Sequence, residues 1–173
     1  MMMRLFILLF GAALVLPKAG AQTFGGTGTT TLSVAVAAEA SVRIDTTTTN
    51  LTSSTTFGAF TGTTNFTYRI RTTAATGSGA ITSRVTADFA AGGPLAASGD
   101  LTYLCTVAAP GTACAGSQTS STGGETPVAS FNADARSADA GTGANSVSWT
   151  LRNSPTFRTG GYTSTVTFTI STT

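Results

Sequence analysis

The feature that most constrains this chain is a strict alternation of apolar and polar side chains. From Leu32 to Ile44 every second residue is apolar, and the intervening positions include Ser33, Glu39 and Arg43. Near the end of the chain, residues 162–170 repeat the pattern with threonine at every second position. Successive side chains of a β-strand point to opposite faces, so a period of two predicts strands with one buried face.

Shorter alternating segments follow one another along the chain, separated by turns rich in Gly, Pro and Asn. They cover residues 66–71, 81–89, 101–107, 128–131 and 147–151. Residues 32–45 are expected to form one long strand, or two strands joined by a bend near Ala38. With no convincing helix, the pattern predicts an all-β fold, a single immunoglobulin-like β-sandwich of about seven to nine antiparallel strands over residues 22–173. Core packing is the expected role of Trp149, Tyr68, Tyr103 and Phe57.

The first residues have the organisation of a secretory signal. Arg4 precedes an apolar run from Leu5 to Leu16, and Ala19-Gly20-Ala21 supplies the small residues that signal peptidase requires. We therefore expect residues 1–21 to be a signal peptide, cleaved before Gln22. The run is short for a bilayer span of about 20 residues, and no membrane span is expected after cleavage. The predicted location is secreted or at the cell surface, reached through the periplasm.

Charge argues against nucleic-acid binding. Arg4 and Lys18 lie in the expected signal peptide, so the remaining chain has seven arginines and seven acidic residues. A balanced chain of this kind has no basic excess to release counterions from a phosphate backbone.

Residue composition also excludes most catalytic chemistry. The sequence contains no His, and its one Lys is Lys18. Ser-His-Asp and Cys-His arrangements are therefore excluded, and the acidic residues are too scattered to suggest a carboxylate pair. We expect a protein that is not an enzyme and uses no cofactor. One oxygen-rich segment, with Asn132, Asp134, Asp139 and Asn145, could supply calcium ligands, but a solvated turn is the expected role and no metal site is predicted.

Two cysteines, Cys105 and Cys114, flank a Pro110-Gly111 turn. In an exported protein an even pair is expected to be oxidised, so the sequence predicts a disulfide between them. The threonines at 163, 165, 167 and 169 would form one row on a strand face. Such a row could bind a polysaccharide, although threonine is also an ordinary residue of exposed strands.

The order of several motifs resembles the spore coat protein U family, which are secreted fimbrial subunits of the archaic chaperone–usher type. The similar segments are "TTTLSVAVAAEASVRI", "FGAF", "LTYLCTV" and "GGYTSTVTFTIS". Position 40, where the family usually carries a cysteine, is Ala40 here. The same features also fit exported immunoglobulin-like sandwiches in general.

The resemblance implies assembly by β-strand addition, in which a neighbour supplies a missing edge strand. Leu32, Val34 and Val36 are the candidate strand-addition residues, and copies of the chain, other subunits and a periplasmic chaperone are the implied partners. The expected function is a non-enzymatic structural or adhesive surface protein, such as a fimbrial subunit. Two alternatives remain open: residues 31–44 pair within their own sheet, or the domain is a secreted module that binds a glycan or another surface ligand.

Overall fold

A computed structural model describes residues 28–173 of the chain. The expected signal peptide and its cleavage site before Gln22 lie outside this range. The chain divides into two units between Val34 and Ala35. Residues 28–34 of the first unit contain no strand.

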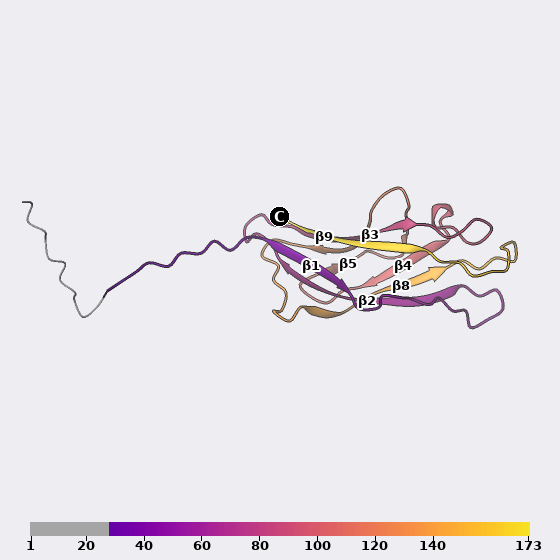
Figure 1. Ribbon diagram of the computed structural model, residues 1–173, viewed down its shortest axis with the longest axis horizontal. Coiled ribbons are helices and arrows are strands. Elements are labelled where there is room, and N and C mark those ends of the chain that lie inside the picture. Colours follow the sequence, from indigo (N-terminus) through magenta and orange to yellow (C-terminus); the bar gives the residue numbers. More distant parts are fainter. Residues whose placement is uncertain (1–27) are drawn as a thin grey trace, which may run out of the picture. The chain divides into compact units, whose positions relative to one another are not determined.

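The second unit is a β-sandwich, which confirms the predicted fold class (Figure 1). Residues 28–173 contain nine strands and one short 3₁₀ turn, Ala96–Ser98. The strands are β1 (Glu39–Ile44), β2 (Phe60–Arg71), β3 (Gly79–Ala87), β4 (Leu101–Thr106), β5 (Thr112–Ala113), β6 (Gln118–Thr119), β7 (Thr126–Phe131), β8 (Thr142–Leu151) and β9 (Thr165–Thr172).

The strands form two antiparallel sheets. The five-stranded sheet has the order β1-β2-β8-β4-β6, and the four-stranded sheet has the order β5-β7-β3-β9. In β2 the inward row is Thr64, Phe66, Tyr68 and Ile70, and in β9 it is Val166, Phe168 and Ile170. Side chains that alternate between apolar and polar in the sequence therefore point alternately into and out of the sandwich.

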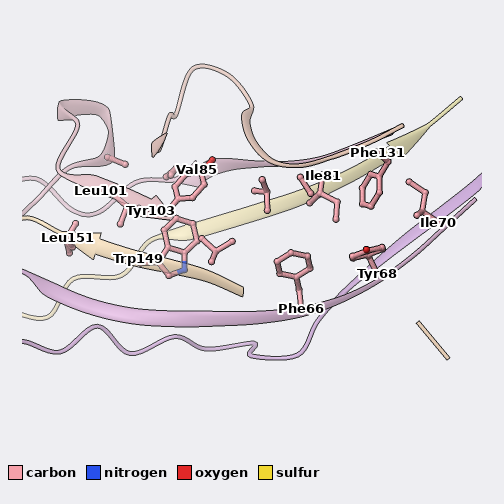
Figure 2. Close-up of a cluster of buried hydrophobic side chains, with 14 of the residues drawn as sticks. Phe66, Tyr68, Ile70, Ile81, Val85, Leu101, Tyr103, Phe131, Trp149 and Leu151 are labelled. Carbon is pink, nitrogen blue, oxygen red and sulfur yellow. The ribbon is translucent and has the colours of Figure 1, made fainter. Parts of the chain in front are cut away.

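One continuous core lies between the sheets (Figure 2). The buried Trp149, Tyr68 and Tyr103 confirm the sequence prediction for these three residues. Phe57 contradicts it, because its side chain is 60% exposed. Its backbone has a positive φ of 55° in the turn before β2, so it lies outside the regular alternation of inward and outward side chains.

The prediction of a strand over residues 32–45 is wrong for its first part. In the structure β1 begins only at Glu39, and residues 28–38 belong to no strand. The reason lies in the partner strand. Glu39 pairs with Arg71, the last residue of β2, and the next amide, that of Thr72, donates instead to the Ala135 carbonyl. Of residues 31–44, only residues 39–44 pair within their own sheet, so that alternative is confirmed for β1 and not for the residues before it.

The predicted disulfide is present and connects the two sheets. Cys105 lies in β4 and Cys114 follows β5, with their Cα atoms 5.6 Å apart. The intervening turn packs on the core, where the Tyr68 hydroxyl donates to the Ala108 carbonyl and accepts from the Gly111 amide. The disulfide thus links the two sheets on the side of the sandwich where β6 and β5 are the end strands.

Between residues 28 and 173, the structure contains no helix with the length and apolar character needed to cross a membrane.

Candidate functional site

The side of the sandwich away from the disulfide is open. Its two strands, β1 and β9, are at the ends of their sheets, and each pairs with one neighbour within the described chain. Their Cα atoms approach within 8 Å, and Figure 1 draws the two strands next to each other. The inward rows of both strands are only half-buried, namely Ala40, Val42 and Ile44 in β1 and Val166, Phe168 and Ile170 in β9. We call this side the open edge.

A cavity of about 1000 Å³ continues the open edge past the end of β1. Apolar side chains from both sheets line its interior, including Ile44, Phe60, Trp149, Val166 and Phe168. Arg158 is the one charged side chain among the described residues that line it. Polar side chains line the cavity as well, among them those of residues 46–50, Asn153 and Ser164.

Aromatic side chains form the floor of the cavity. The Phe168 ring lies 6.2 Å from the Phe66 ring and 6.4 Å from the Trp149 ring, measured between centroids. Trp149 also packs against Tyr103 at 5.2 Å, as Figure 2 illustrates. The indole Nε1 of Trp149 donates a hydrogen bond of 2.8 Å to the Thr64 hydroxyl. The buried indole N–H therefore has a partner, which holds the Trp149 ring in place.

Phe89 and Pro94 line the cavity and belong to one loop, which two aspartates hold in place. The Asp88 carboxylate accepts hydrogen bonds from the backbone amides of Phe89, Ala96 and Ala97. Asp100, whose side chain is 4% exposed, accepts from the Leu95 amide and from Arg152 Nε. Residues distant in sequence are thereby joined around one end of the cavity.

The pKa of Asp88 is lowered from its ordinary value of 3.8. Burial acts to raise this pKa, but the hydrogen bonds from the amides of Ala97, Ala96 and Phe89 together outweigh it. A carboxyl whose pKa is lower in the folded than in the unfolded chain stabilises the fold fully above the unfolded value. This contribution is lost as the pH falls through the folded value.

We therefore expect Asp88→Ala to reduce the free energy of unfolding at pH 7 by about 1–2 kcal/mol, the usual effect of removing a capping carboxylate. The difference from the wild type should begin to shrink as the pH falls below the unfolded value of 3.8, and it should be lost as the pH falls through the lower pKa of the folded chain, where Asp88 becomes protonated. Urea unfolding at pH 7 and at pH 2.5 measures both values. Asp139→Ala, at an exposed loop position, is the matched control. A cost for Asp88→Ala that is equal at the two pH values would contradict the assignment.

The three candidate strand-addition residues are highly exposed. Leu32 is 90% and Val34 86% exposed in the first unit, and Val36 is 66% exposed in the second. Exposed apolar side chains on every second residue of a segment outside any strand are unusual, because burial of a Val or Leu side chain is worth about 1.5–3 kcal/mol. Sequence reasoning identified these residues, but it could not identify the open edge, which depends on the order of strands in both sheets.

Two residues of the oxygen-rich segment have partners within the fold. Asn145 is buried, and its side-chain amide donates to the carbonyls of Phe66 and Thr142. Asp134 instead pairs with Arg136. Within residues 28–173, no group of three or more acidic, Cys or His side chains is placed to hold a metal ion.

The threonine row lies on the outer face of β9. Thr165, Thr167 and Thr169 are exposed, and Thr169 is directly opposite Thr82 of β3. The hydroxyls of Thr86 and Thr167 are 3.1 Å apart and bond to each other. This part of the row satisfies its own hydrogen bonds across the two strands.

Comparison of the chain with protein-family models, with curated proteins and with solved protein structures finds no match.

Proposed function

We propose that this chain is an exported structural subunit that assembles with copies of itself by β-strand addition. Residues 28–36 of one copy enter the open edge of the next and pair with the free edges of β1 and β9. The observation that carries the proposal is the coexistence, in one chain, of an apolar cavity at an open edge and an exposed apolar row outside any strand.

The dimensions of the two parts agree. Side chains two residues apart in a strand are about 6.6 Å apart along it, so Leu32, Val34 and Val36 span roughly 13 Å. The residues of β9 and of the segment before it that line the cavity run from Phe157 to Phe168, so the cavity extends beyond the length of this row. Three alternate apolar side chains would therefore fit within the part of the edge that is hollow.

The direction of the donated strand follows from the positions of the chain ends. Glu39 pairs with Arg71, and the Thr172 hydroxyl donates to the Arg71 carbonyl, so β1 begins where β9 ends. In a linear polymer the donated segment must leave its acceptor at the opposite end, near Ser164, away from the end where the acceptor's own first residues lead into β1. The donated strand then runs antiparallel to β9, with Leu32 near Phe168 and Val36 near Ser164.

An unpaired edge is a hazard before assembly, since any other strand can add to it. We infer that a periplasmic chaperone covers the edge until a second copy arrives. The subunit would be displayed at the cell surface or secreted, where the Cys105–Cys114 disulfide is stable. Adhesion is the expected role of the resulting polymer.

Substitution of one residue of the row tests the proposal. We expect the wild-type chain, purified after export, to form large assemblies by light scattering. Val34→Asp should reduce assembly more than tenfold, because it would place an unpaired charge in the apolar cavity. Ser33→Asp adds the same charge to the opposite face of the segment and should assemble like the wild type.

Two results would contradict strand addition. One is a Val34→Asp chain that assembles as well as the wild type. The other is a wild-type chain that remains single at all concentrations. If that single chain binds a glycan array, the alternative function as a carbohydrate-binding module is favoured instead.

A further inference from the structure

Each copy carries both the open edge and the segment proposed to fill one, so it could in principle close its own edge. Closure within one copy would compete with assembly. The residues that decide this lead from the apolar row into β1, namely Ala35, Val36, Ala37 and Ala38, all in the same unit as the sandwich. We call residues 35–38 the neck.

Arg71 contacts the neck directly. Its Nε donates a hydrogen bond of 2.7 Å to the Ala37 carbonyl, and its Nη2 lies 3.1 Å from the Glu39 carboxylate. Arg71 is the last residue of β2 and pairs with Glu39 across the sheet. One guanidinium group thus binds a backbone atom of the neck and the first side chain of β1.

Strand register limits how the segment could fold back on β1. A two-residue turn at 37 and 38 would place Val36 opposite Glu39 and Val34 opposite Ser41. Directly opposed residues share a face, and Glu39 and Ser41 are exposed, so the apolar row would point to solvent. A short turn of this kind cannot fill the cavity.

A three-residue turn gives the correct face. With residues 36–38 in the turn, Val34 is opposite Ala40, and with residues 37–39 in the turn, it is opposite Val42. Such turns usually need a residue in the left-handed region, for which Gly or Asn is suited. Residues 35–43 contain no Gly, Asn, Asp or Pro. Both turns also include Ala37, whose carbonyl is held by Arg71.

We propose that Arg71 is a positioning residue that keeps the neck extended and so prevents each copy from closing its own open edge. The proposal rests on the proposed function, because it concerns the choice between the copy's own segment and that of a neighbour. Arg71 contributes by holding the Ala37 carbonyl, while the register and the absence of turn residues disfavour the same closure independently.

The test uses the full exported chain in a form that makes the turn possible. Ala38→Gly supplies the left-handed third residue of a three-residue turn over residues 36–38 and retains Arg71 and Glu39. The measurement is hydrogen–deuterium exchange of the amides of residues 28–36 immediately after refolding at nanomolar concentration, where meeting a second copy is slow. The fluorescence of the buried Trp149 reports whether each variant has refolded.

We expect fast exchange of residues 28–36 in the wild type and in the turn variant. Adding Arg71→Ala to the turn variant should slow exchange at least tenfold and reduce assembly. Arg71→Lys, which cannot bind both acceptors in the same way, should give an intermediate value. Arg69→Ala is the matched control: it removes an exposed arginine from the same face of β2 and should change nothing.

Equal exchange in the turn variant with and without Arg71→Ala would overturn the role of Arg71, whether or not the wild type assembles. Slow exchange of residues 28–36 in the dilute wild type would overturn it as well. Assembly of the wild type is measured separately from exchange. If the wild type assembles but Arg71→Ala does not slow exchange in the turn variant, only the role of Arg71 is refuted. If Arg71→Ala slows exchange but the wild type never assembles, only strand addition is refuted.

Discussion

A peptide with the sequence of residues 28–38 is expected to stabilise the single-chain Val34→Asp form of this protein. The variant's own segment is disabled, but its open edge is intact, so the peptide can take the place of a neighbour's strand. At a peptide concentration 100 times the dissociation constant, the free energy of unfolding should rise by about 2.7 kcal/mol. For a domain of this size the midpoint of thermal unfolding should rise by roughly 5–10 °C.

The affinity of the peptide would come from the side chains that it buries. Leu32, Val34 and Val36 are exposed in the free chain, and each would gain about 1.5–3 kcal/mol on entering the apolar cavity. The peptide backbone would also pair with the free edges of β1 and β9. The ordering of the peptide backbone opposes this gain.

Two control peptides distinguish strand addition from nonspecific binding of an apolar peptide. A peptide carrying Val34→Asp should give no shift, because its charge would lie in the cavity. A peptide carrying Ser33→Asp should act like the wild-type sequence, because position 33 faces away from the cavity. Equal shifts from both peptides, or no shift from the unchanged peptide, would contradict the assignment of residues 32, 34 and 36 to the open edge.

The alternation of side chains was sufficient to predict the fold class and most of the core. Phe66, Tyr68 and Ile70 were predicted to share a face, and all three are buried. The Cys105–Cys114 disulfide could also be predicted, because the Pro110-Gly111 turn brings the two strands together. These predictions depend on local properties of the sequence, which is why they were confirmed.

The beginning of the first strand could not be predicted by the same reasoning. Residues 32–38 alternate as regularly as residues 39–44, but only the second group has a partner. The difference arises from β2, which ends at Arg71 because its next amide bonds to Ala135. A strand needs a neighbour as well as a pattern, and the neighbour is set by residues about 30 and 100 positions further along the chain.

The open edge was also beyond sequence reasoning. It exists because β1 and β9 end their respective sheets on the same side, and the order of strands in both sheets must be known to see this. The contacts of Arg71 with Ala37 and Glu39 have the same origin, since they join residues 34 and 32 positions apart. The open edge and the contacts of Arg71 therefore depend on the order of the strands, which the alternation of side chains does not reveal.

Trp149→Ala is expected to have the largest effect on the stability of the single chain. Trp149 is 5% exposed, packs against Tyr103 and Phe168, and donates a hydrogen bond to the Thr64 hydroxyl. Removal of a buried aromatic side chain of this size costs about 3–5 kcal/mol. Such a loss is a large part of the total for a domain whose free energy of unfolding is on the order of 5–15 kcal/mol.

Two further substitutions divide this effect into its parts. Trp149→Phe retains most of the ring contacts and should cost less than Trp149→Ala. Thr64→Val leaves the indole N–H without its acceptor and should cost about 1–3 kcal/mol. Urea unfolding of the single-chain Val34→Asp background measures all three without interference from assembly. If Trp149→Ala lowered the free energy of unfolding less than Thr64→Val, the floor of the cavity would have collapsed to fill the space. A cavity that collapses in this way is not rigid enough to select three side chains by their spacing.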